Sequence, residues 1–192
     1  MKPAGLSGSP GARPLRLKTA VELGAAFRAA LARGDGAAGA HCIHERWMRG
    51  ESFAGEIEAD LAALWKSAAA SIPDWLPMRH VSWLPLAYEV AARFSATGRG
   101  RTNIYLVLLD FSERRGDDHG VYVGMSQYPA SQRFDQHKAG IRAAGSVLQR
   151  GLEVLTGPVL HLQRIPRGEA RRIEGQLAQA LGDAGIKVEG GH

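Results

Sequence analysis

The feature that most constrains the fold is an apolar run from Ile104 to Phe111, which meets no charged residue until Asp110. Short runs of β-branched, aromatic and leucine side chains are typical of a buried strand. A second run of this kind, Gly120 to Met125, follows a polar loop that contains Gly116. The two runs therefore predict an antiparallel hairpin with a long connection.

The pattern after the hairpin predicts the rest of a small α/β domain. Prolines near helix starts and glycines just past helix ends favour a helix at 129–139 and a final helix at 166–182. A further helical piece is expected at 147–155, and a third strand at 159–165. We therefore expect residues 103–192 to form a mixed three-stranded sheet with flanking helices, an α/β (α+β) fold.

The part before this domain has the texture of a helical region. Residues 1–18 are rich in Gly, Pro and Arg and are expected to form a flexible arm, followed by a helical region at 19–100. Thr19 and Glu22 have the spacing of a capping box, and Gly34 can end that helix. A second helix is predicted by an apolar stripe of Phe53, Ile57, Leu61, Leu64, Trp65 and Ala68.

The charge balance favours a polyanionic partner. The net charge is +5 and the isoelectric point about 9.7. Lysine and arginine contacts release counterions from nucleic-acid phosphates, so a basic protein gains affinity for such partners. Residues 1–102 carry +4 of this charge and residues 103–192 carry +1, which favours a contribution from the N-terminal half to nucleic-acid binding.

Cysteine content and hydropathy bear on the compartment. Cys42 is the single cysteine, so the chain has no internal disulfide, and this usage fits a reducing compartment such as the cytoplasm. No apolar run approaches the ~20 residues of a membrane span, so we expect no membrane association. His41 and His44 could form half of a zinc site, but no second Cys or His pair completes it, and we interpret them as structural.

Four short motifs occur in order along the C-terminal domain. Asn103-Ile104-Tyr105 lies in the first predicted strand and Tyr122-Val123-Gly124 in the second; Arg133 and His137 share the next helix, and Glu174 lies on the last one. In this order and on these elements, the motifs resemble the GIY-YIG nuclease family over roughly residues 103–192. Two departures stand out: Asn103 replaces the first glycine, and Tyr128-Pro129 adds one residue before the helix.

The resemblance implies an activity and a site. It implies a metal-dependent endonuclease that hydrolyses phosphodiester bonds, with DNA as the expected substrate and Mg²⁺ or Mn²⁺ as the cofactor. The implied catalytic residues are Tyr105, Tyr122, Arg133, His137 and Glu174, with Glu174 as the metal ligand.

The chemistry of these residue types agrees with that expectation. Arg133 and His137 are four residues apart and share one helix face, so both can point at one phosphate, and a guanidinium forks onto two of its oxygens. Tyr105 and Tyr122 on adjacent strands can flank the attacking water, and either can orient or deprotonate it. One carboxylate, Glu174, with waters and substrate oxygens suffices for Mg²⁺.

Two alternatives stay open from sequence. The first is a fold that has lost catalysis and serves as a nucleic-acid-binding or interaction module. The second concerns the substrate, because the residues do not separate DNA from RNA. If the enzyme hypothesis holds, the five side chains must converge on one concave face, since one metal and one phosphate are shared among them.

Overall fold

The computed structural model describes residues 11, 13–50, 54–112 and 119–191. The chain forms two compact units, residues 1–85 and 86–192. The boundary falls within α4 (Leu84–Ala91), so residues 86–102 belong to the C-terminal unit and not to the helical N-terminal region expected at 19–100. Among the described residues, no helix is both long and apolar enough to cross a membrane.

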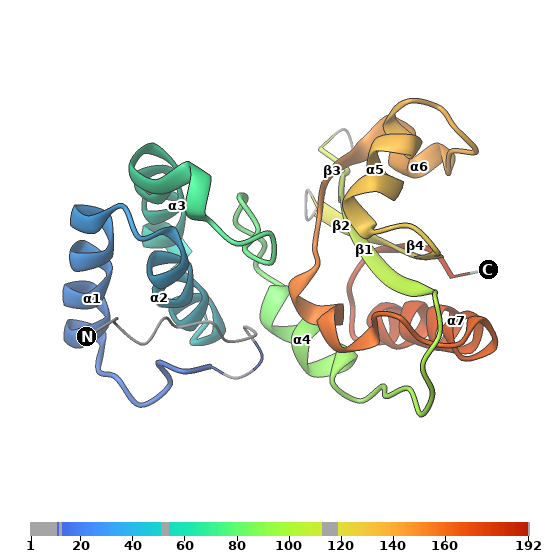
Figure 1. Cartoon of the computed structure of the whole chain (residues 1–192), viewed down its shortest axis with the longest axis horizontal. Coiled ribbons are helices and arrows are strands. Elements are labelled where there is room, and N and C mark those ends of the chain that lie inside the picture. Colours follow the sequence, from blue (N-terminus) through green and yellow to red (C-terminus); the bar gives the residue numbers. More distant parts are fainter. Residues whose placement is uncertain (1–10, 12, 51–53, 113–118, 192) are drawn as a thin grey trace. The chain divides into compact units, whose positions relative to one another are not determined.

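The N-terminal unit is helical. It contains α1 (Ala20–Arg33), α2 (Gly36–Met48), α3 (Ala54–Ala68) and the short 3₁₀ helix η3 (Ala69–Ser71), and the three α-helices pack against one another (Figure 1). The predicted start and end of α1 are confirmed. The Thr19 hydroxyl accepts from the Glu22 backbone N–H at 3.2 Å, and the Glu22 carboxylate accepts from the Thr19 N–H at 2.7 Å. Gly34 ends the helix in the left-handed region, at a φ of 64°.

Helix α2, which is almost wholly buried, was not predicted from the sequence. Gly36 and Gly39 are poor helix formers and hide the pattern, but both are required by packing. A Cβ on Gly36 would lie 2.5 Å from the Ser71 backbone, and one on Gly39 would lie 2.4 Å from a Leu64 methyl carbon. The glycines therefore let α2 approach its neighbours closely.

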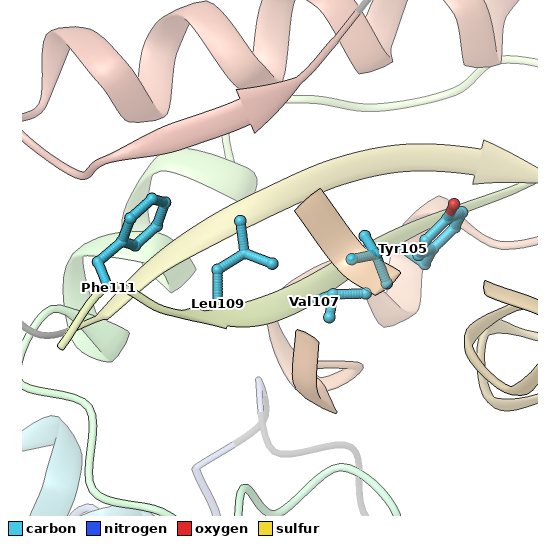
Figure 2. Close-up of a cluster of buried hydrophobic side chains, with 5 residues drawn as sticks. Tyr105, Val107, Leu109 and Phe111 are labelled. Carbon is cyan, nitrogen blue, oxygen red and sulfur yellow. The ribbon is translucent and has the colours of Figure 1, made fainter. Parts of the chain in front are cut away.

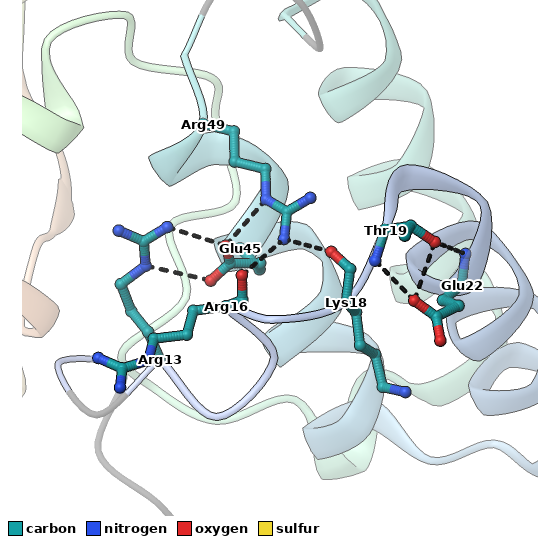
Figure 3. Close-up of polar contacts among 7 residues, drawn as sticks. All are labelled: Arg13, Arg16, Lys18, Thr19, Glu22, Glu45 and Arg49. Atoms are coloured by element: carbon teal, nitrogen blue, oxygen red, sulfur yellow. Dashed lines mark hydrogen bonds and ion pairs between the residues drawn. The ribbon is translucent and has the colours of Figure 1, made fainter.

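Residues 13–18 are attached to α2, contrary to the expectation of a flexible arm over 1–18. The Glu45 carboxylate accepts two hydrogen bonds from the Arg13 guanidinium, at 2.8 and 3.1 Å (Figure 3). Arg49 donates to the backbone carbonyls of Arg16 and Lys18 and binds Glu45 as well. The buried Glu45 carboxylate, hydrogen-bonded to both Arg13 and Arg49, therefore holds residues 13–18 against α2. Residues 1–10 and 12 lie outside the described part of the chain.

The C-terminal unit is built on a four-stranded mixed sheet in the order β3-β1-β2-β4. The strands are β1 (Asn103–Asp110), β2 (His119–Ser126), β3 (Gly151–Val154) and β4 (Val188–Gly190). The predicted hairpin is confirmed: β1 and β2 pair antiparallel with Tyr105 opposite Gly124. The loop around Gly116, residues 113–118, lies outside the described residues.

Two elements of the sheet were predicted wrongly. Residues 159–165 do not form the third strand, because Gly157–Leu162 is the 3₁₀ helix η4, with Pro158 in its first turn. The third strand is β3, in the stretch 147–155 that was predicted as helix; only α6 (Gly145–Arg150) is helical there. β4 pairs parallel with β2 as a fourth strand, which was not predicted from the sequence.

Helices cover both faces of the sheet. On one face, Tyr105, Val107, Leu109 and Phe111 form a buried cluster with Val147 (Figure 2). That face is covered by α5 (Ala130–Lys138) and α6, while α7 (Arg167–Asp183) packs on the opposite side (Figure 1). This arrangement is a mixed α/β fold with flanking helices.

The N-terminal unit should lose stability in mild acid. Burial lowers the pKa of His44 to about 4, and the nearby His41 acts in the same direction. Because an unfolded histidine binds a proton near pH 6.5, the folded unit resists protonation between pH 6.5 and 4 and loses about 3 kcal/mol across that window. Thermal unfolding of the parent and of His44→Gln, followed by circular dichroism from pH 7.5 to 4.5, measures this. An equally steep loss in both proteins would contradict the assignment to His44.

Candidate active site

Two tyrosines lie on the face of the sheet that α5 covers. Tyr105 belongs to the buried β1 cluster, and Tyr122 on β2 packs against it. Their ring centroids are 6.0 Å apart. A Cβ on Gly124 would lie 2.6 Å from the Tyr105 hydroxyl oxygen and 2.7 Å from Cε1 of Tyr122. Glycine at this position is therefore what lets the two rings lie side by side.

The helix α5 adds a histidine to this pair. His137 is 1% exposed, and its ring centroid lies 6.2 Å from that of Tyr105 and 6.0 Å from that of Tyr122. Its Nε2 lies 2.9 Å from the Tyr105 hydroxyl oxygen. The three rings thus form one compact aromatic cluster.

The hydrogen bonds of His137 define its tautomer. The backbone N–H of Ala144 donates to Nδ1 at 2.9 Å, so Nδ1 carries no proton. The neutral ring therefore carries its proton on Nε2 and donates it to the Tyr105 oxygen. Burial and the charge of Arg133 lower the pKa of His137 to about 4, so the ring stays neutral at physiological pH. The spacing of His137 from Arg133 predicted that both side chains could point at one phosphate. Both ring nitrogens of His137 instead form hydrogen bonds within the protein, so the ring is not free to bind a phosphate.

Both tyrosines are neutral before substrate binds. Burial raises the pKa of Tyr105 above its usual range; Tyr122 adds to the rise and the Arg133 charge opposes it. Burial also raises the pKa of Tyr122, with a further contribution from the negative charge of Glu174. A neutral phenol donates and accepts hydrogen bonds, so both hydroxyls are suited to orienting a water or a phosphate oxygen.

Arg133 combines a structural and an electrostatic role. Its guanidinium donates to the carbonyls of Ile141 and Arg142 at 3.1 and 2.8 Å, and to the Gln136 side-chain oxygen at 3.2 Å. These acceptors are uncharged, so the positive charge is not neutralised, and a guanidinium has five N–H donors. The charge is close enough to affect the pKa of His137 and of both tyrosines.

Glu174 approaches from a different layer. It lies on α7, on the side of the sheet opposite α5, and is 7% exposed. Its negative charge contributes to the raised pKa of Tyr122, after the larger effect of burial. The backbone carbonyl of Glu174 lies near Gly191, just beyond β4, where a Cβ on the glycine would lie 2.4 Å from that of Ala178. Tyr105, Tyr122, Arg133 and His137 therefore gather on one face of the sheet. Glu174 comes from the helix on the other side, so the expected convergence of all five residues on one face is not met for Glu174.

The donor set suits one kind of metal. Within the described residues, no three His, Cys, Asp or Glu side chains gather to hold an ion. A single carboxylate such as Glu174 fits a hydrated Mg²⁺ or Mn²⁺ ion that takes its other ligands from water and substrate.

Asn103 was identified in the sequence only as a replacement of the first glycine of the resembled motif. The Asn103 side-chain N–H donates to the Tyr128 carbonyl at 3.0 Å, and its oxygen accepts from the Arg164 backbone N–H at 2.9 Å. Asn103 therefore joins β1 to the loop before α5 and to the segment before α7. A glycine there could make neither bond. The sequence feature that could have predicted this role is a side-chain amide at the first residue of a buried strand.

No protein-family model, curated protein or solved structure significantly matches this chain.

The neutral Nε2–H tautomer of His137 is directly measurable. In the ¹⁵N-labelled protein we expect an unprotonated Nδ1 and a protonated Nε2 from pH 5 to 8, because protonation of the ring requires a pH near 4. The Tyr105→Phe variant removes the acceptor of Nε2–H and should shift that resonance while leaving Nδ1 unprotonated. Titration of His137 near pH 6.5, or a protonated Nδ1, would contradict the hydrogen-bond assignment.

Proposed function

We propose that the C-terminal unit is a metal-dependent endonuclease that hydrolyses phosphodiester bonds, with DNA as its substrate. The observation that carries the proposal is the buried contact between the Tyr105 hydroxyl and His137 Nε2, with Tyr122 and the charge of Arg133 beside it. Phosphodiester hydrolysis needs a positioned water and positive charge at the phosphate. The resemblance to GIY-YIG nucleases supports the same activity.

Tyr105 is the residue proposed to position the attacking water. His137 donates to the Tyr105 oxygen, and the Tyr105 hydroxyl also interacts with the side chains of Tyr122 and Arg133, so the attacking water is proposed to lie among these polar groups. The raised pKa of Tyr105 favours orientation of the water over its deprotonation in the free protein. His137 acts as a positioning residue, since it fixes this hydroxyl and does not itself face the substrate.

Arg133 and Tyr122 are proposed to bind the reacting phosphate. Arg133 supplies a fixed positive charge, and its remaining N–H donors can reach non-bridging oxygens. Tyr122 stays protonated because its pKa is raised, so its hydroxyl donates to an anionic oxygen. The loop at 141–142, held by Arg133, keeps the guanidinium in place without neutralising it.

Glu174 is the residue proposed to hold Mg²⁺ or Mn²⁺, and such an ion would supply positive charge to stabilise the transition state and the leaving oxygen. The effect of the Glu174 charge on the pKa of Tyr122 supports this assignment.

Two substitutions separate an enzyme from a binding module. Glu174→Gln keeps the size of the side chain but removes the negative charge proposed to bind the metal. Arg133→Lys keeps the positive charge but removes the paired N–H donors of the guanidinium group. Each should slow cleavage by about 10²–10³-fold, the usual effect of losing one preorganised electrostatic group. Cleavage of duplex, branched and single-stranded DNA and RNA in Mg²⁺ or Mn²⁺ is measured together with affinity in metal-free buffer.

The controls are Glu58→Gln and Arg93→Ala, which alter exposed residues outside the site. These variants should cut like the parent, and all four should keep the parent's circular dichroism spectrum. A parent that binds nucleic acid but cuts none of these substrates would replace the enzyme with a non-catalytic binding module.

A further inference from the structure

A strip of the C-terminal unit beside the candidate site is hollowed and basic. It consists of two segments, 98–102 and 163–167, which run side by side. One hollow of about 400 Å³ is lined from residues 96–100 and 161–165, and includes Arg99 and Arg164. A second, of about 250 Å³, includes Arg167 and, from the end of β2, Ser126 and Gln127.

The backbone of this strip is held rigidly. Gly100 N–H donates to the Arg164 carbonyl at 2.7 Å, and Thr102 and Ile165 exchange hydrogen bonds of 2.8 and 3.1 Å. A Cβ on Gly100 would lie 2.3 Å from the Ile165 carbonyl oxygen, so only glycine permits this approach. The two segments therefore form a fixed base for the side chains they carry.

The charge on the strip is of one sign. Arg99, Arg101, Arg164 and Arg167 are all exposed, and no carboxylate lines either hollow. Within the described residues, the guanidinium groups of these four arginines form no ion pair or hydrogen bond. The nearby Glu169 carboxylate is occupied by the backbone N–H and the hydroxyl of Thr97. Free guanidinium groups above polar hollows are suited to phosphate oxygens.

Arg164 has an unusual backbone conformation. Its φ is 56°, in the left-handed region that favours glycine, and the Asn103 side chain and Gly100 hold it there. Unfavourable backbone conformations cluster at binding and catalytic sites. Arg164 is therefore an exposed arginine on a backbone segment that is held on both sides.

The strip leads directly to the reacting groups. Asn103 supports both Arg164 and Tyr128, and lies two residues before Tyr105 on β1. Ser126, which lines the second hollow, pairs with Asn103 across the hairpin. A chain of phosphates lying along the strip would therefore continue into the Tyr105 cluster.

We propose that this strip binds the sugar-phosphate backbone of the nucleic-acid strand beside the phosphate that is cut, through Arg99, Arg164 and Arg167. The inference rests on the proposed function for its choice of ligand, but binding and cutting are separable. Contacts of this kind carry no sequence information, and they position the strand so that one phosphate meets Tyr105.

The test is the salt dependence of binding by the full-length protein. Affinity for a fluorescent 20-nucleotide single strand is measured in calcium-free, magnesium-free buffer at several salt concentrations. Each phosphate contact on a single strand contributes about 0.7 to the slope of log K against log salt. The slope is negative, and the Arg99→Ala/Arg167→Ala double variant should reduce its magnitude by about 1.4. Adding Arg164→Gly should reduce the magnitude by about 2 in total.

Two matched proteins control for net charge and folding. Arg28→Ala/Lys66→Ala removes the same charge from exposed positions on α1 and α3, and Arg99→Lys/Arg167→Lys keeps the charge on the strip. An unchanged slope in the double alanine variant, or an equal loss in the α1/α3 variant, would overturn the proposal. Equal affinity for polyglutamate, with the same losses, would overturn the choice of nucleic acid.

The result is independent of catalysis. If the parent never cuts but the strip variants show the expected change in salt dependence, the strip proposal is supported and the nuclease proposal is contradicted. If the parent cuts but the strip variants bind with the parent's salt dependence, the nuclease proposal is supported and the strip proposal is contradicted.

Discussion

The hydrogen bond from His137 Nε2 to the Tyr105 hydroxyl is the contact on which the rest of the site depends. It joins α5 to the middle of the sheet, and the Ala144 N–H completes it by holding the other ring nitrogen. Because both histidine nitrogens are used, the protonation state of His137 is defined, and its Nε2–H holds the Tyr105 hydroxyl beside Tyr122 and Arg133. The absence of a side chain at Gly124 makes the same space available to Tyr122. A buried polar pair of this kind is costly to disrupt, which is why it can orient reacting groups precisely enough to matter.

Asn103 extends this order from the cluster to its surroundings. Its amide holds the Tyr128 loop on one side and Arg164 on the other, so the same strand that carries Tyr105 also supports the basic strip. The position where the chain departs from the resembled motif is therefore a position where it gains two hydrogen bonds. Glu174 lies on α7 in the other layer, and its negative charge contributes to the raised pKa of Tyr122.

Local signals predicted the hairpin, α1 with its capping box, and the final helix, because apolar periodicity and caps are properties of neighbouring residues. Elements that depend on distant contacts were missed. α2 needs two glycines for close packing, and β4 is a three-residue strand defined only by its pairing with β2. The segment 159–165 has strand-like composition, yet Pro158 and the packing of η4 override it. At the site, the spacing predicted that Arg133 and His137 share one helix face. It could not predict the hydrogen bond from the Ala144 N–H to His137 Nδ1, since that bond forms across a loop.

The most direct test of the central claim is single-turnover cleavage by the parent and by Tyr105→Phe, with saturating protein and Mg²⁺ or Mn²⁺. The account predicts that the parent cuts, and that the variant binds the substrate as tightly but cuts about 10²–10³-fold more slowly, because only the hydroxyl that positions the water has been removed. Cleavage by Tyr105→Phe at the parent's rate would contradict the account.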